Sequence, residues 1–197
     1  MRVVAVEPNE PMIEVGRARG GANIQWRLGT AESSGLDDQS VDLVLCAQAF
    51  HWVDAPRALT EFRRVLRQRT PSGVPGRCAV VWNVHDESDG FTRAYREVIV
   101  RHATEPPTSP SFTGHERTPR FEAPQWGGAR LETHEHEQVL VEAALIGRAV
   151  SSSYCPSAGP AYERLVAELR DLHSRWERDG LVRLKYQTRV HLAERAV

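Results

Sequence analysis

The architecture of this chain follows from one stretch, residues 40–54, which reads SVDLVLCAQAFHWVD. The run Val41–Ala47 is apolar except for Asp42, and this pattern predicts a parallel strand that is buried on both faces. Asp54 is suited to cap a following helix, because its carboxylate can accept a main-chain hydrogen bond and Pro56 is tolerated in the first helical turn. The stretch therefore predicts a strand, a polar turn and a helix.

Polar and aromatic side chains occupy the turn itself, from Gln48 to Trp52. In open α/β sheets, ligands bind at the carboxyl ends of the strands, so we expect this turn to face a ligand. His51 is the candidate residue for contact with a reacting substrate or for base catalysis. The alternative is that His51 and Trp52 pack the turn against the next helix.

Composition narrows the class of protein. The chain has 197 residues, of which 41% are hydrophobic and 26% charged, with a formal net charge of -1, as expected for one globular domain. This charge argues against binding to nucleic acid or to an anionic membrane surface. Three cysteines, Cys46, Cys78 and Cys155, have no paired spacing, which disfavours a disulfide framework or a zinc ribbon. We expect a cytoplasmic protein with no membrane span and no signal peptide.

Strand and helix patterns alternate over the first hundred residues. Strands are expected at residues 2–7, 23–28, 41–47 and 78–84, and helices at 9–20, 55–66 and 91–102. This alternation predicts an α/β fold with a parallel sheet and right-handed crossovers.

The second half of the chain has a different pattern. Residues 105–125 contain five prolines and predict a long irregular segment. A polar strand at 130–140, a short helix at 141–152 and a long helix at 160–179 follow, and Trp176 of the long helix is expected in the core. Alternating residues at 184–192 predict a half-buried strand, which is typical of an antiparallel edge.

Two short groups of residues resemble parts of a nucleotide site. Glu7 closes the first strand at a helix start, where a carboxylate can accept hydrogen bonds from both hydroxyls of a ribose or can simply interact with the helix dipole. Ala31 and Glu32 follow the next strand, where they could border an adenine edge or lie in a solvated loop.

The order of these features resembles the class I S-adenosylmethionine-dependent methyltransferases. An acid ends one strand, Ala-Glu follows the next, and residues 38–44, DQSVDLV, lead into residues 49–52, AFHW. The helix at 58–66 and the segment Val81-Trp82-Asn83 are also similar to that family. The resemblance is closest to the small-molecule branch that includes trans-aconitate methyltransferase, and it covers residues 3–102 well.

The resemblance implies a Rossmann-like sheet, mostly parallel with an antiparallel C-terminal edge, and S-adenosylmethionine as the cofactor. Glu7 would hold the cofactor ribose and Met12 would pack near it. Ala31 and Glu32 would contact adenine. The chain would be one methyltransferase-like domain, with a cofactor-binding core at 1–104, a Pro-rich loop at 105–128 and a cover with edge strands at 129–197.

Ala47 and Gln48 would border the methionine part of the cofactor, and a small molecule would accept the methyl group. Which acceptor it is, and the oligomeric state, stay open. His85 and Asp86, which follow the strand at 78–84, are candidates for the acceptor pocket.

The chain departs from the family at its beginning, because no first strand and no Gly-rich turn precede Arg2. That strand would sit between the strands at 3–6 and 41–47, so we expect an N-terminally truncated chain with an incomplete cofactor site. The alternative function is an inactive remnant that acts, if at all, as an interaction module through exposed sheet edges. A nicotinamide dehydrogenase fits less well, since nothing resembles an acid–base pair for hydride transfer.

A histidine pair in the later polar strand offers a different site. His134 and His136 share one face of that strand with Glu132. Metal ligation by the three is possible, but a solvated charged face is the preferred interpretation, and no metal is expected.

Overall fold

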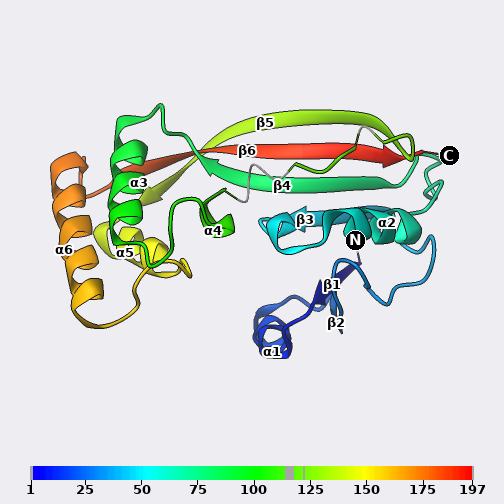
Figure 1. Ribbon diagram of the computed structural model, residues 1–197, viewed down its shortest axis with the longest axis horizontal. Coiled ribbons are helices and arrows are strands. Elements are labelled where there is room, and N and C mark those ends of the chain that lie inside the picture. Colours follow the sequence, from blue (N-terminus) through cyan, green and yellow to red (C-terminus); the bar gives the residue numbers. More distant parts are fainter. Residues whose placement is uncertain (1, 114–117, 122, 197) are drawn as a thin grey trace. The chain divides into compact units, whose positions relative to one another are not determined.

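The computed structural model describes residues 2–113, 118–121 and 123–196. The chain divides into two compact units. Unit 1 comprises residues 1–80, 119–130 and 191–197, and unit 2 comprises residues 81–118 and 131–190. Figure 1 labels the helices and strands in chain order. The expected division into one domain with a core, a loop and a cover stays a prediction.

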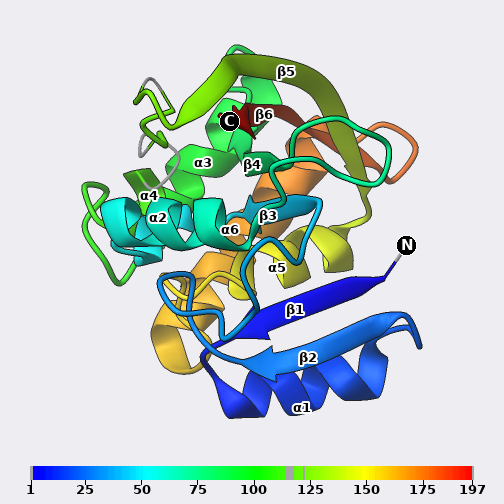
Figure 2. The ribbon, with the colours of Figure 1, turned by 90° about the vertical axis from the view of Figure 1, so that its right-hand side faces the viewer.

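The first part of unit 1 is a strand–helix–strand unit. Strands β1 (Val3–Glu7) and β2 (Ile24–Leu28) pair in parallel, with Val3 opposite Ile24 and Glu7 opposite Leu28. Helix α1 (Glu10–Arg19) connects them and covers one face of this two-stranded sheet (Figure 2). The expected cap at Asn9 is confirmed, since its side chain accepts a hydrogen bond from the Met12 N–H at 3.1 Å. The predicted parallel arrangement is therefore present at the start of the chain.

The stretch at 40–54 forms the expected strand, turn and helix. Strand β3 (Leu43–Ala47) is followed by a 3₁₀ turn (Phe50–Trp52) and by helix α2 (Ala55–Val65). Asp54 caps α2, as predicted, by accepting a hydrogen bond from the Arg57 N–H at 3.2 Å. The apolar face of α2 is buried in the core of unit 1 and consists of Ala58, Leu59, Phe62 and Val65.

The prediction that the strand at 41–47 is buried on both faces is wrong. Within β3 only Cys46 is buried, whereas Leu43 is 51% and Leu45 is 61% exposed. The physical reason is position, because β3 ends the order of its sheet and has one neighbour among the described strands, β4. The apolar run Val3–Val6 also predicts a buried strand, but every residue of β1 is only partly buried.

The remaining strands form a four-stranded sheet in the order β3-β4-β6-β5 (Figure 1). Its later members are β4 (Arg77–His85), β5 (Trp126–Leu140) and β6 (Val182–Arg195). Strand β6 runs antiparallel to β4, since Gly76 accepts from Arg195 at one end while Asp86 donates to Lys185 at the other. The expected antiparallel direction of the C-terminal strand is therefore confirmed, but β6 lies inside the sheet, between β4 and β5, and not at its edge. Strands β1 and β3 lie in separate sheets and are not direct neighbours, as expected.

Unit 2 has a helical core. Its helices are α3 (Gly90–His102), α4 (Pro110–Thr113), α5 (Glu142–Val150) and α6 (Gly159–Trp176). Their apolar faces meet side chains of β6 in one cluster that includes Phe91, Tyr95, Leu145, Leu169 and Leu184. Trp176 was expected in this core but is 44% exposed, because it belongs to the last turn of α6, where its ring only borders Phe91 with a centroid distance of 6.0 Å.

Three further expectations concern the chain as a whole. The segment at 105–125 contains the short helix α4, and its residues 114–117 and 122 lie outside the described structure. All three cysteines are buried free thiols, and burial raises the pKa of the Cys46 thiol to about 11. In the described part of the chain, no helix is long and apolar enough to cross a membrane.

Candidate functional site

The carboxyl ends of β1 and β2 place the first two groups of candidate residues at one edge of the two-stranded sheet. Glu7 and Leu28 end the paired register, and the Gly29 N–H donates to the Glu7 carbonyl at 3.2 Å. The Glu7 carboxylate turns toward the start of α1, where its Oε1 accepts a hydrogen bond from the Asn9 N–H at 3.0 Å. A half-buried carboxylate therefore stands at a strand end and a helix start.

The second group lies in a tight turn after β2. Thr30 and Ser33 exchange main-chain hydrogen bonds of 3.1 and 3.2 Å, and they enclose Ala31 and Glu32 between them. Glu32 Oε1 accepts a hydrogen bond from the main-chain N–H of Asp54 at 2.7 Å. Burial alone would raise the pKa of the Glu32 carboxyl, but the hydrogen bond from Asp54 and the nearby Thr30 and Arg57 outweigh burial and lower it. Glu32 is therefore ionised and anchors the start of α2.

The third group follows β3. Ala47 ends the strand and is exposed, and Gln48 comes next with φ of 54°, in the left-handed region that non-glycine residues seldom adopt. This backbone geometry ends the extended chain and starts the 3₁₀ turn. Met12 lies in the first turn of α1 and is 57% exposed. The six expected cofactor residues are thus at or beside the carboxyl ends of three strands.

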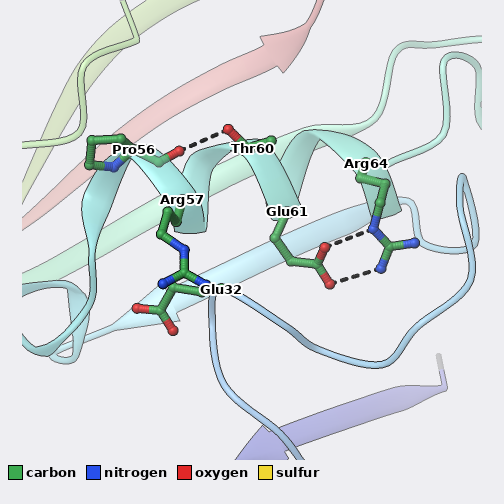
Figure 3. Close-up of a pocket in the computed structure, with 6 residues that line it drawn as sticks. All are labelled: Glu32, Pro56, Arg57, Thr60, Glu61 and Arg64. Atoms are coloured by element: carbon green, nitrogen blue, oxygen red, sulfur yellow. Dashed lines mark hydrogen bonds and ion pairs between the residues drawn. The ribbon is translucent and has the colours of Figure 1, made fainter.

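An open hollow of about 330 Å³ lies along the polar face of α2 (Figure 3). Its walls are the side chains of Glu32, Pro56, Arg57, Thr60, Glu61 and Arg64. Figure 3 shows Glu32 beside Arg57, and Glu61 facing Arg64. Of the residues predicted from sequence as cofactor ligands, Glu32 alone is a wall of this hollow.

The buried carboxylate in this hollow, Glu61, was missed by the sequence analysis. It is 8% exposed, accepts a hydrogen bond from the Ser34 N–H at 2.9 Å, and pairs with the Arg64 guanidinium at 2.7 and 2.8 Å. Arg64 lowers the pKa of the Glu61 carboxyl to about 2, with Ser34 helping, although burial acts the other way. The only local signal in the sequence is the spacing of Glu61 and Arg64, three residues apart on a helix.

This ionic network has a structural effect. Arg64 also donates to the Leu36 carbonyl at 2.6 Å and pairs with Asp38 at 2.5 Å. The network therefore fastens the loop at 34–38 to α2, with the guanidinium of Arg64 shared between the carboxylates of Glu61 and Asp38. We interpret it as a support for the strand ends rather than as a reacting group.

The candidate residues for contact with the methyl acceptor, His51, His85 and Asp86, belong to different units. His51 is half-buried in the 3₁₀ turn of unit 1, with its ring 4.4 Å from that of Trp52. In unit 2, His85 ends β4 and its ring is 5.0 Å from that of Tyr186. Asp86 accepts hydrogen bonds from the N–H and hydroxyl of Ser88, at 3.1 and 2.7 Å. The acceptor role of these residues stays a prediction.

The two histidines of β5, His134 and His136, are exposed and belong to a polar face of the strand. His134 Nε2 lies 3.8 Å from Glu132 Oε2, whereas the ring of His136 packs 5.0 Å from that of Tyr186. Across the described residues, no group of three or more histidine, cysteine or acidic side chains is placed to hold a metal ion.

A comparison with protein families gives a match over the segment that contains β1, β2 and β3. Residues 1–70 match the family model described as a methyltransferase domain. An uncharacterized methyltransferase of Mycobacterium tuberculosis is 48% identical over 99 residues, which cover 50% of this chain and 38% of that protein. An uncharacterized methyltransferase-like protein of Schizosaccharomyces pombe is 32% identical over 117 residues, covering 59% of this chain and 43% of that protein. The chain thus matches only these shares, 38% and 43%, of the curated relatives' own length.

A solved structure has the same fold. A protein described as a type II methyltransferase from Anaeromyxobacter dehalogenans superposes with a TM-score of 0.58 at 24% identity. The superposition covers 98% of this chain and 80% of that one. The predicted fold class, a Rossmann-like sheet of the methyltransferase type, is therefore confirmed.

Proposed function

Because residues 1–70 match the model of a methyltransferase domain, we propose that this chain serves S-adenosylmethionine-dependent methyl transfer to a small-molecule acceptor. The observation that carries the proposal is the placement of Glu7, Glu32 and Gln48 at or shortly after the carboxyl ends of three strands of unit 1. In such folds the carboxyl ends of the strands are where nucleotide-like ligands bind.

The Glu7 carboxylate fits the ribose of this cofactor. It is half-buried at a strand end, and a carboxylate has enough lone pairs to accept from two ribose hydroxyls as well as from the Asn9 N–H. Met12 lies one helical turn further on, exposed and apolar, where it would pack beside the sugar. These two residues form the ribose end of the proposed site.

The adenine and the methionine part of the cofactor would lie at the carboxyl ends of the next two strands, β2 and β3. Ala31 is a small residue in the tight turn after β2, where an adenine ring could approach the main chain, with Glu32 held beside it by Asp54. Ala47 and Gln48 would border the methionine part, since the left-handed backbone at Gln48 turns the chain away from β3.

When bound, S-adenosylmethionine supplies a methyl group on a positively charged sulfur, which is displaced in line by the acceptor. The residues of this chain would then position the acceptor and exclude water, and both effects favour such a displacement. His51 would hold the acceptor's proton if the acceptor is a hydroxyl or an amine, because an imidazole exchanges protons near neutral pH. We also propose that the protein works in the cytoplasm, since its three cysteines are free thiols.

The test is a calorimetric titration of the 197-residue chain with S-adenosylhomocysteine. We expect saturable binding that Glu7→Ala weakens by about tenfold or more, the effect of losing a charge-assisted hydrogen bond. Glu10→Ala is the matched control, because Glu10 is an exposed carboxylate in the first turn of the same helix. Equal affinity of Glu7→Ala and wild type would remove the assignment of Glu7, and a folded wild-type chain that binds nothing would overturn the proposed function.

A further inference from the structure

Strands β5 and β6 are neighbours in the sheet, and the start of β5 and the end of β6 belong to unit 1. The Tyr186 hydroxyl donates to Gln138 Oε1 at 2.8 Å near the start of β6. Beyond the end of β6, the Ala196 N–H donates to the Gln125 carbonyl at 3.1 Å. Residue numbers thus rise along one strand while they fall along the other, so the two strands are antiparallel.

This register places the side chains of Arg195 and Trp126 opposite each other on one face of the sheet, one position inside the Ala196–Gln125 bond. The two residues are 8% and 6% exposed. The Arg195 guanidinium also donates to the main-chain carbonyl of Leu66, the residue at the C-terminal cap of α2. A guanidinium, an indole and the end of a helix therefore meet inside unit 1.

Three N–H groups in this region are buried without an acceptor. Among the described residues, the Nε atoms of Arg195 and Arg63 and the Nε1 atom of Trp126 are covered from solvent and have no hydrogen-bond partner. Arg63 belongs to the last turn of α2, three residues before Leu66. A buried N–H without an acceptor destabilises a fold, and such groups are usually satisfied by a ligand or an ordered water. The three donors therefore mark a place for an acceptor.

The two guanidinium charges in this region also lack a counter-ion. Within the part of the chain that the structure describes, Arg63 and Arg195 form no ion pair, whereas other arginines of unit 1, namely Arg64, Arg67 and Arg77, each pair with a carboxylate. Burial lowers the pKa of the Arg195 guanidinium, and the positive charge of Arg63 lowers it further, so the two charges repel each other. A water molecule could accept a hydrogen bond here, but only an anion would also remove this repulsion.

We propose that Arg195, Arg63 and Trp126 bind a phosphate group in unit 1. The three donors come from β6, α2 and β5, so they approach an acceptor from different directions. A tetrahedral phosphate offers an oxygen to each donor, whereas a planar carboxylate has only two oxygens. The phosphate is either free or part of a phosphorylated small molecule, and the experiment below distinguishes the two.

The first experiment follows the indole N–H signals of the 197-residue chain by nuclear magnetic resonance during titration with inorganic phosphate. Ionic strength is held constant and no cofactor is added. The chain has five tryptophans, and Trp126→Phe assigns the signal of Trp126 by removing it. We expect this signal to move in a saturable way, with a Kd of about 1 mM or lower. A Trp126 signal that phosphate does not move would overturn the proposal.

Two further arms of the same titration define the ligand. Succinate, a dicarboxylate, should bind at least about tenfold more weakly than phosphate, and equal binding of the two would contradict the assignment of a phosphate site. Phenyl phosphate carries the same group on a small organic molecule. Tighter binding of phenyl phosphate than of inorganic phosphate would identify a phosphorylated small molecule as the ligand, and weaker binding would identify free phosphate.

Calorimetric titration with phosphate then measures the part of each side chain. Arg63→Gln removes one charge-assisted donor and should weaken binding by about tenfold. The matched control is Arg67→Gln, because Arg67 follows in the same segment but pairs with Asp42 at 2.6 Å. The control should keep the wild-type affinity within about twofold. Equal losses in the two variants would overturn the proposal.

A second pair of variants covers the case in which Arg63→Gln does not fold. Trp126→Phe keeps an aromatic ring but removes the N–H donor, so we expect about fivefold weaker binding of phosphate. Trp176→Phe is its control, because Trp176 is 44% exposed and belongs to unit 2. Wild-type affinity in Trp126→Phe would remove the indole from the site and overturn the proposal.

These outcomes are independent of the titration with S-adenosylhomocysteine, which carries no phosphate group. Phosphate binding that depends on Arg63, without cofactor binding, would retain the phosphate site and reject the methyltransferase proposal. Cofactor binding that depends on Glu7, without any phosphate binding, would do the reverse.

Discussion

The carboxylate of Glu32 accepts a hydrogen bond from the main-chain N–H of Asp54 across 2.7 Å. Asp54 is itself the cap of α2, so the turn after β2 and the helix after β3 share one hydrogen-bonded link. Of the candidate cofactor residues, Ala31 belongs to this turn, and Gln48 lies between β3 and the cap of α2. The strength of this link is therefore expected to affect both the stability of unit 1 and the affinity for cofactor.

Replacement of Glu32 separates these two effects. Glu32→Ala removes the acceptor for the Asp54 N–H and should lower the free energy of unfolding by about 1–2 kcal/mol. Glu32→Gln keeps an oxygen acceptor of the same size and should lose clearly less. Urea denaturation of both variants measures the difference, and equal losses would show that the charge, not the hydrogen bond, matters.

The Glu61–Arg64 pair gives a second prediction. Glu61→Gln keeps the size of the side chain but removes its charge from a buried position that faces Arg64 and Ser34. We expect a loss of about 1–3 kcal/mol in the free energy of unfolding, because Arg64 is partly exposed and recovers some hydration. Asp42→Asn is the control, since the Asp42–Arg67 pair at 2.6 Å is more exposed and should change stability by less than about 1 kcal/mol. A smaller loss for Glu61→Gln than for the control would contradict the expectation.

Acid should destabilise the folded chain through the same carboxylate. The pKa of Glu61 is about 2 in the folded state against an ordinary value of 4.5, so the folded state binds this proton less readily than the unfolded state. Its stabilising contribution is therefore complete above the ordinary value and is lost as the pH falls from about 4.5 toward 2. Urea titrations between pH 7 and pH 3 should show a shallower decline for Glu61→Gln than for wild type. Parallel curves would show that Glu61 does not carry the acid sensitivity.

The left-handed backbone at Gln48 predicts an unusual pair of variants. Gln48→Gly and Gln48→Ala remove the same side chain, but only glycine adopts a φ of 54° without strain. The glycine variant should be more stable than the alanine variant by about 1 kcal/mol, and thermal unfolding measures this difference. If the Gln48 side chain borders the cofactor, both variants should bind S-adenosylhomocysteine equally weakly. Wild-type affinity in both would show that the side chain makes no contact with it.

Local signals were sufficient to predict the two helices of unit 1 and their caps. Asn9 and Asp54 each stand directly before an apolar-periodic segment, and each caps its helix as expected. Such signals act over three or four residues, so one sequence contains them fully. The parallel pair β1–β2 and the antiparallel pair β4–β6 were predictable for a similar reason, since the runs of apolar residues and the alternating runs differ along the chain.

Burial and pairing over long separations were not predictable in this way. The composition of β3 indicates a buried strand, but whether Leu43 and Leu45 are covered depends on which segments lie beside them. The contact between Ser34 and Glu61 joins residues 27 positions apart, and no local pattern specifies it.

The three buried cysteines can report local opening of the folded structure. Cys46 and Cys78 belong to unit 1 and Cys155 belongs to unit 2, and burial raises the pKa of each thiol. A thiol-reactive reagent modifies such groups slowly until the surrounding structure opens and the thiolate can form. The labelling rates of these native cysteines therefore reveal, without any engineered probe, whether the two units open together or one before the other.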